Sequence, residues 1–237
     1  MAVYVYSVVA STHPQRLDGL DGVGDPPSAL RTVPSGKLAA VVSDTPEGLR
    51  PKRRDLAAHQ AVQERLMADG TLLPLQFGLT APDDEVVRMA LEERAEKYTT
   101  RLRVLEGCAE YHLKATRDEG SLLRRILLDS EEARGLNEEI RSGRGRPGLP
   151  AALGELIAQE VRARQDAQAA QVVGALGRLA REERVSQPAG EDFLNVSFLV
   201  ESGREEGFVS AEKELADELG EDFSLRLRGP LPAYSFV

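Results

Sequence analysis

The chain has few residues of the kinds that perform redox or metal chemistry. Of its 237 residues one is cysteine, three are histidine and none is tryptophan, while aromatic residues make up 5%. The single Cys108 cannot form an internal disulfide, and no motif pairs it with a base, so we expect a small buried residue rather than a nucleophile. The histidines are scattered, and neither HExxH nor paired CxxC motifs occur. The sequence therefore predicts no catalytic residues and no metal site.

Long apolar runs and an excess of positive charge are also missing. No run of about 18 uncharged apolar residues occurs, which argues against a membrane-spanning helix. Residues 1–10 are apolar but lack a cationic leader, and their alternating tyrosines indicate a first β-strand rather than a signal peptide. Lysine and arginine number 30 against 39 aspartate and glutamate, for a net charge of -9, so an electrostatic nucleic-acid binder is not expected. We expect a soluble cytoplasmic protein that binds no nucleic acid.

The glycines and lysines do not have the spacing of a nucleotide-binding motif. Gly36-Lys37 is followed by Leu38 rather than serine or threonine, and Arg31 stands where a P-loop requires its first glycine. The glycines of the first loop do not form GxGxxG either. No cofactor is therefore predicted.

The first half alternates short strands with amphipathic helices. The pattern predicts strands at 3–10, 29–33, 38–43 and 71–77, a helix at 55–70 with Asp55 as its N-cap, and a helix from 82 to 107. Pro74 interrupts the last strand, which indicates a sheet edge or a bulge. His59 lies on the predicted inner face of the first helix, where we expect a packed, hydrogen-bonded side chain rather than a general base.

The second half restarts the strand pattern and contains a long helix. Strands are predicted at 109–116, 193–200 and 223–227, and helices at 119–128, 131–141, 150–184 and 208–219. This split β-α-β order is typical of ferredoxin-like sheets. Helix 150–184 would be about 50 Å long, so we expect it to form an antiparallel hairpin with 119–141. Ala163, Ala167 and Ala170 form a small-residue stripe suited to contact with the other helix.

We therefore predict an α+β chain of two domains. The first covers residues 1–107. The second covers residues 108–237 and is a modified ferredoxin-like sheet with a long helical hairpin insertion, 119–184, and a C-terminal tail, 229–237.

Charge is concentrated in two segments. Residues 185–222 hold 11 acidic and two basic residues, so their net charge equals that of the whole chain. A solvated surface is the ordinary explanation, and an acidic docking face is the alternative. Arg50-Pro-Lys-Arg-Arg54 places four cations directly before a helix, where positive charge is unfavourable. This cluster is either a solvated loop or a partner contact.

Seven short segments, in order along the whole chain, resemble one known family. They are Tyr4-Val-Tyr6, Ala39-Ala-Val-Val-Ser43, Leu56-Ala-Ala-His59, Leu73-Pro-Leu-Gln-Phe-Gly78, Leu105-Glu-Gly107, Asn195-Val-Ser-Phe-Leu-Val200 and Gly229-Pro-Leu-Pro-Ala-Tyr-Ser-Phe-Val237. The family they resemble is that of the gas vesicle proteins GvpF and GvpL. The sequence departs from its pattern at Gln76, where an arginine is common, and at Ala233, which replaces a proline.

The resemblance implies a non-enzymatic accessory protein of gas vesicle assembly, located in the cytoplasm in association with gas vesicles. Its partners would be the hydrophobic shell protein GvpA and other gas vesicle accessory proteins. It would nucleate the shell or, like a chaperone, keep shell subunits soluble. The resemblance does not distinguish GvpF from GvpL and implies no oligomeric state.

A partner of an apolar shell subunit must offer strand edges or apolar surface. The candidate partner-binding residues are therefore those of the basic cluster, the edge strand and the tail: Arg50, Lys52, Arg53, Arg54, Leu73, Phe77, Tyr234 and Phe236. We expect the tail to pack back on the sheet rather than to serve as a free peptide ligand. Two alternatives are a small-molecule-binding ferredoxin-like enzyme that uses His59 with a nearby carboxylate, and a regulatory scaffold that self-associates through the hairpin.

Overall fold

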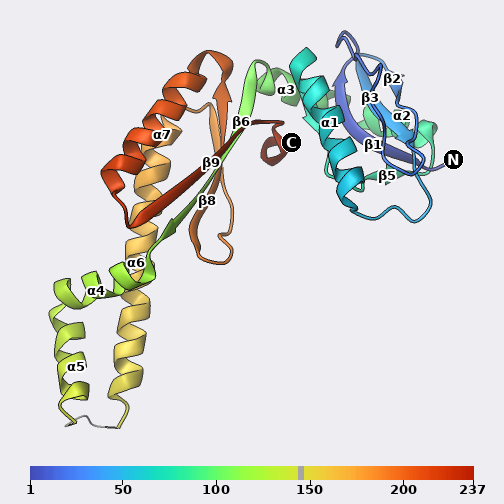
Figure 1. Ribbon diagram of the computed structural model, residues 1–237. Coiled ribbons are helices and arrows are strands. Elements are labelled where there is room, and N and C mark those ends of the chain that lie inside the picture. The colour runs from blue at the N-terminus through green and yellow to red at the C-terminus, as the bar shows by residue number, and fades with distance from the viewer. Residues whose placement is uncertain (144–146) are drawn as a thin grey trace. The chain divides into compact units, whose positions relative to one another are not determined.

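The computed structural model describes residues 1–143 and 147–237, which divide into two compact units (Figure 1). The first unit comprises Met1–Tyr111, Leu199–Ser202 and Gly229–Val237, and the second comprises His112–Phe198 and Gly203–Arg228. The domain boundary after residue 107 stays a prediction. The two units do not follow a single boundary in the chain, because the tail contributes Ala233 and Phe236 to the core of the first unit.

The first unit is built on an antiparallel sheet around strand β1. The strand order is β2 (Arg31–Ser35), β3 (Leu38–Asp44), β1 (Val3–Ala10) and β4 (Leu72–Pro74), and the two-residue β5 (Thr80–Ala81) also pairs with β1. The first seven residues of β1 are buried. Because both faces of this strand are covered, its residues are apolar except for Ser7, whose buried hydroxyl donates to Gln63 Oε1 at 2.6 Å.

A register shift between Val5 and Ser7 decides which β1 side chains share a face. Val3, Val5 and Val8 belong to one apolar cluster, whereas Tyr4, Tyr6 and Val9 belong to the other. A strict period of two would have put Val8 with the tyrosines, so the irregularity at Tyr6 moves the strand's second half to the opposite alternation. Both tyrosines consequently face helix α1.

The helices of the first unit cover the two faces of the sheet. Helix α1 (Arg53–Asp69) adds Val62 and Leu66 to the tyrosine cluster. Helices α2 (Asp84–Glu93) and α3 (Ala95–Leu105) add Val87, Leu91, Leu102 and Leu105 to the valine cluster. The single helix predicted over 82–107 is therefore wrong. The chain leaves the helical conformation at Arg94, and the two short helices on either side both direct their apolar residues into the valine cluster.

Other boundaries in the first unit also differ from the prediction, and β2 spans 31–35 rather than 29–33. Helix α1 begins at Arg53 with Lys52 at the N-cap, and the predicted cap Asp55 instead accepts a hydrogen bond from the Gly24 amide at 2.9 Å. Strand β4 is shorter than predicted and ends at Pro74. It pairs with β1 alone, so the predicted edge position is confirmed.

The second sheet has the order β7 (Glu182–Val185), β8 (Asp192–Glu201), β6 (Cys108–Arg117) and β9 (Phe223–Leu231). Three helices lie between β6 and β7 in the chain, and α7 (Glu205–Leu219) lies between β8 and β9. This order confirms the predicted α+β class with a modified ferredoxin-like second part. Strand β9 extends four residues past the predicted end at 227, because the Gly-Pro-Leu segment continues its pairing.

The three helices between β6 and β7 form the predicted hairpin. Helices α4 (Glu119–Asp129) and α5 (Glu131–Arg141) lie beside the first part of α6 (Leu149–Gly177), as Figure 1 shows. Leu122, Ile126 and Ala133 are buried there against α6. Residues 144–146 of the predicted loop lie outside the described part of the chain.

Two details of α6 contradict the prediction. Ala163, Ala167 and Ala170 are exposed, because the hairpin core uses Leu153, Leu156, Ile157 and Val161 on a different face. The helix also ends at Gly177 rather than near 184. The chain folds back there so closely that a Cβ at Gly177 would lie 2.2 Å from Glu183 Oε2, and residues 182–185 form β7.

Candidate partner-binding surface

The basic cluster lies exposed at the start of α1. Arg54 forms an ion pair with Asp25, and its Nε lies 3.7 Å from the buried Asp55. Within the described residues, Arg50, Lys52 and Arg53 have no carboxylate within ion-pair distance. Three of the four cations are thus available to a partner at an end of the helix where no side chain caps the backbone N–H groups.

An aromatic cluster lies along the same helix, centred on His59. The His59 ring is stacked on Tyr6 with centroids 5.6 Å apart and meets Tyr4 edge-on at 5.7 Å. Phe77 completes the group, with its centroid 5.8 Å from that of His59 and 5.7 Å from that of Tyr4. Such edge-on and offset contacts between rings stabilise beyond the area they bury.

The polar atoms of the cluster are satisfied internally. Tyr4 Oη lies 2.8 Å from His59 Nδ1 and accepts from the Gly78 amide at 3.1 Å. The Gln63 amide nitrogen donates to the Tyr6 carbonyl at 2.6 Å and lies 3.3 Å from His59 Nε2. Because an amide nitrogen only donates, this contact favours a lone pair on Nε2 and a neutral ring.

Burial determines the protonation states of His59 and of the tyrosines around it. Only 5% of His59 is exposed, and this burial lowers its pKa below the ordinary value. Burial also raises the pKa of Tyr4 and Tyr6, and it raises the pKa of Tyr234 to about 12. The ring is therefore neutral and the three hydroxyls are protonated at neutral pH.

The C-terminal tail closes the cluster. Tyr234 Oη lies 3.2 Å from His59 Nε2. The Glu110 carboxylate accepts from the Ser235 amide at 2.9 Å and from its hydroxyl at 2.7 Å, and Arg101 Nε donates to the Phe236 carbonyl. The expectation that the tail packs back is confirmed, and the surface it packs on is the core of the first unit.

The structure separates the predicted apolar site residues into two groups. Phe77 is half-buried and Tyr234 is 36% exposed, and both contact His59. Leu73 and Phe236 are 0% and 2% exposed, so they support the surface from beneath. Sequence reasoning missed the exposed Leu56 and Leu79. Helical spacing predicted Leu56 on the inner face with His59, so no sequence pattern indicated that Leu56 is exposed.

The arrangement around His59 does not favour the enzyme alternative. That alternative needs a carboxylate beside His59 in a pocket, yet the groups that contact the ring within the described residues are two tyrosine hydroxyls, an amide, the Leu75 backbone and aromatic rings. The same residues contain no group of three or more histidine, cysteine, aspartate or glutamate side chains placed to hold a metal ion. Nor does any helix among them have the length and apolar content to cross a membrane.

Comparison with known proteins decides the family. A family model described as "Gas vesicle synthesis protein GvpL/GvpF" matches residues 2–237. The chain belongs to this family. It is 44% identical over 238 residues to "Gas vesicle protein F" of Streptomyces sp. (strain CB03234), covering all of both chains. It is 29% identical over 258 residues to "Gas vesicle protein L" of the same strain, covering 99% of this chain and 92% of that protein.

Solved structures of this GvpL/GvpF family share the fold. The crystal structure of GvpF from Anabaena sp. PCC7120 matches with a TM-score of 0.87 at 20% identity, over 99% of this chain and 97% of that one. That of GvpF from Microcystis aeruginosa matches with a TM-score of 0.81 at 22% identity, over 99% and 98%. The family resemblance predicted from seven short segments is thus confirmed, and membership supports a role in gas vesicles.

Proposed function

We propose that this protein is an accessory factor of gas vesicle assembly that binds the hydrophobic shell protein GvpA and other gas vesicle proteins. In this role it nucleates the shell or, like a chaperone, keeps shell subunits soluble until they are incorporated. What supports the proposal is family membership over the whole chain, together with three partly exposed side chains of the first unit, Leu56, Phe77 and Tyr234, and the exposed cations Arg50, Lys52 and Arg53 at the start of α1. We propose that these six side chains act as one surface.

This surface, which we call the α1 surface, has the chemistry that such a partner needs. Partly exposed aromatic rings contribute much contact area at low entropic cost, and here the hydrogen-bonded cluster beneath them fixes two of the rings in place. The cations beside them favour a partner segment that has acidic residues next to its apolar ones. A modest apolar area of this kind suits a reversible contact, which an assembly factor requires.

A capture experiment with the full-length chain tests the proposal. Immobilised protein is incubated with GvpA and, separately, with the other gas vesicle proteins. We expect retention of GvpA, and we expect the double variant F77A/Y234A to reduce it at least about tenfold. The triple variant R50Q/K52Q/R53Q should weaken retention most at low salt. R65Q on the same helix and L128A on α4 are matched controls, since both residues are exposed outside the α1 surface.

Retention of none of the gas vesicle proteins by the unaltered chain would refute the proposal. Equal losses in the controls and in the α1-surface variants would instead refute the assignment to that surface. The alternative of a self-associating scaffold is tested by sedimentation of the chain alone, because self-association makes the sedimentation coefficient rise with protein concentration.

The higher identity to protein F than to protein L also leads us to propose that the chain belongs to the GvpF branch of the family. Complementation of strains that lack one or the other protein would test this assignment.

A further inference from the structure

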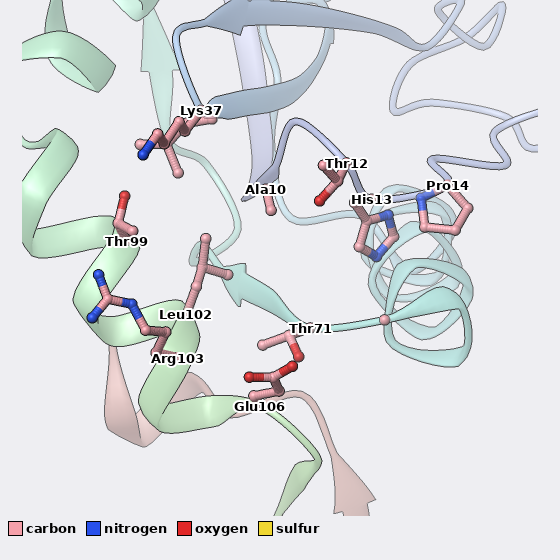
Figure 2. A pocket seen from close by; sticks show the side chains of 12 residues that line it. Ala10, Thr12, His13, Pro14, Lys37, Thr71, Thr99, Leu102, Arg103 and Glu106 are labelled. Carbon is pink, nitrogen blue, oxygen red and sulfur yellow. The ribbon is translucent and has the colours of Figure 1, made fainter.

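A concave site in the first unit shares no lining residue with the α1 surface. It is a pocket of about 290 Å³ where β1 ends, β3 begins and α3 passes over. Figure 2 shows the side chains that line it. Ala10, Leu38 and Leu102 give it an apolar floor, and both leucines are nearly inaccessible to solvent.

Two cations from different elements converge on one side of this pocket. Lys37 comes from the turn before β3 and Arg103 from the last turn of α3, and Figure 2 shows Thr99 between them. Thr99 and Arg103 are four residues apart on α3 and therefore share a helical face. The one acid among the lining residues, Glu106, points toward Thr71 at another part of the pocket.

The side chains of both cations are exposed. Many arginines of this acidic chain are paired, as Arg31 is with Asp44 and Asp84, and Arg164 with Asp129. Within the described residues, no carboxylate lies within ion-pair distance of Lys37 or Arg103. Two like charges facing one pocket repel each other, and an anion between them would relieve that repulsion.

The walls of the pocket are already fixed. His13 Nε2 donates to the Leu66 carbonyl at 3.0 Å, and His13 Nδ1 accepts from the Gln15 amide at 3.1 Å. Both ring nitrogens are thus used for structure, and the ring serves as a wall. The Lys37 carbonyl accepts from the Ser11 amide at 2.9 Å, which anchors the base of that side chain. A ligand would therefore enter a preformed site and order little backbone.

From this geometry we infer that the pocket binds a small organic anion. Its phosphate or carboxylate group lies between Lys37 and Arg103 and accepts from the Thr99 hydroxyl. A compact apolar part of the ligand covers Leu38 and Leu102. The volume suits a molecule of about the size of an aromatic phosphate ester. This inference is independent of GvpA binding, since none of these side chains belongs to the α1 surface.

Titration of the full-length protein with defined probes tests the inference. Calorimetry or NMR shifts are measured with phenyl phosphate, benzoate and the neutral benzyl alcohol. We expect saturable binding of at least one anionic probe, with dissociation constants of about a millimolar or tighter, and none of the alcohol. K37Q and R103Q should each weaken anion binding about tenfold, whereas K97Q, an exposed lysine on the same helix, should leave it unchanged.

The chemistry of the anion is read from which probe binds. Binding of phenyl phosphate alone identifies a phosphate ester, and binding of both anions identifies a site for either group. No saturable binding of either anion below about 20 mM, equal binding of the alcohol, or equal weakening by K97Q would overturn the inference. Capture of GvpA by K37Q, measured in parallel, separates this result from the proposed function, because that capture should be unaffected.

Discussion

The hydroxyl of Tyr234 lies 3.2 Å from Nε2 of His59, although 175 residues separate them in the chain. This contact joins the C-terminal tail to helix α1 and places an aromatic side chain of the tail on the same histidine ring that Phe77 contacts. The α1 surface therefore exists only when the last residues are folded back.

The tail should depend on the Glu110 carboxylate. E110A removes the carboxylate that accepts from the Ser235 amide and from its hydroxyl, so we expect unfolding free energy to fall by about 1–3 kcal/mol. S235A removes only the hydroxyl contact and should cost about 1 kcal/mol. Urea denaturation measures both, and release of the last residues by carboxypeptidase should be faster for E110A. An unchanged digestion rate would show that the tail is held by Phe236 and Arg101 instead.

Gly229 should tolerate no side chain. A Cβ there would lie 2.5 Å from Cδ1 of Tyr111, so we expect G229A to destabilise the protein by about 1–3 kcal/mol. Y111A in the same chain should recover part of the loss in a double-mutant cycle. G154A is the matched control, because it lies in α6 with open space around it and should be neutral or stabilising by up to about 1 kcal/mol. Additive effects of G229A and Y111A would contradict the predicted clash.

Stability should fall as the pH drops below about 6.5, the ordinary histidine pKa. The pKa of His59 is lowered by burial, so the unfolded chain takes up a proton in this range before the folded chain does. The stabilisation is complete above the unfolded pKa and is lost as the pH falls toward the folded one. Burial raises the pKa of Glu212, so the stabilisation that this carboxyl contributes is lost as the pH rises, opposite to the effect of His59.

The difference between the protein and H59Q isolates the histidine contribution. Unfolding free energies measured from pH 7.5 to 5 should decline less steeply for H59Q. Parallel curves for the two proteins would mean that the His59 ring is protonated equally in the folded and unfolded states.

The helical hairpin should depend on Ile126 and not on the alanine stripe. Ile126 is fully buried against α6, so I126A should cost about 2–5 kcal/mol and increase hydrogen exchange in α4 and α5. A167S, at an exposed position on α6, should change both by little. If A167S increased exchange as much as I126A did, the packing face assigned to α6 would be wrong.

The order of elements was predictable because it depends on local periodicity. The apolar run at 3–10 and the spacing of apolar residues along each helix act over a few residues, so the pattern predicted both halves and the hairpin. It failed at Arg94 and Gly177, where the chain turns because of what packs against it. It also chose the wrong face of α6, since small residues permit close contact without requiring it.

The sequence by itself determined the apolar strands, the helices that cover them, the family and the position of the cations before α1. Only the tertiary structure decided that Phe77 and Tyr234 meet at His59, that Leu73 and Phe236 lie beneath the surface, and that Lys37 and Arg103 face one pocket. Periodicity reports which side of its own element a residue occupies. Contacts between residues far apart in the chain depend instead on how the sheets and helices pack, and no local pattern encodes that.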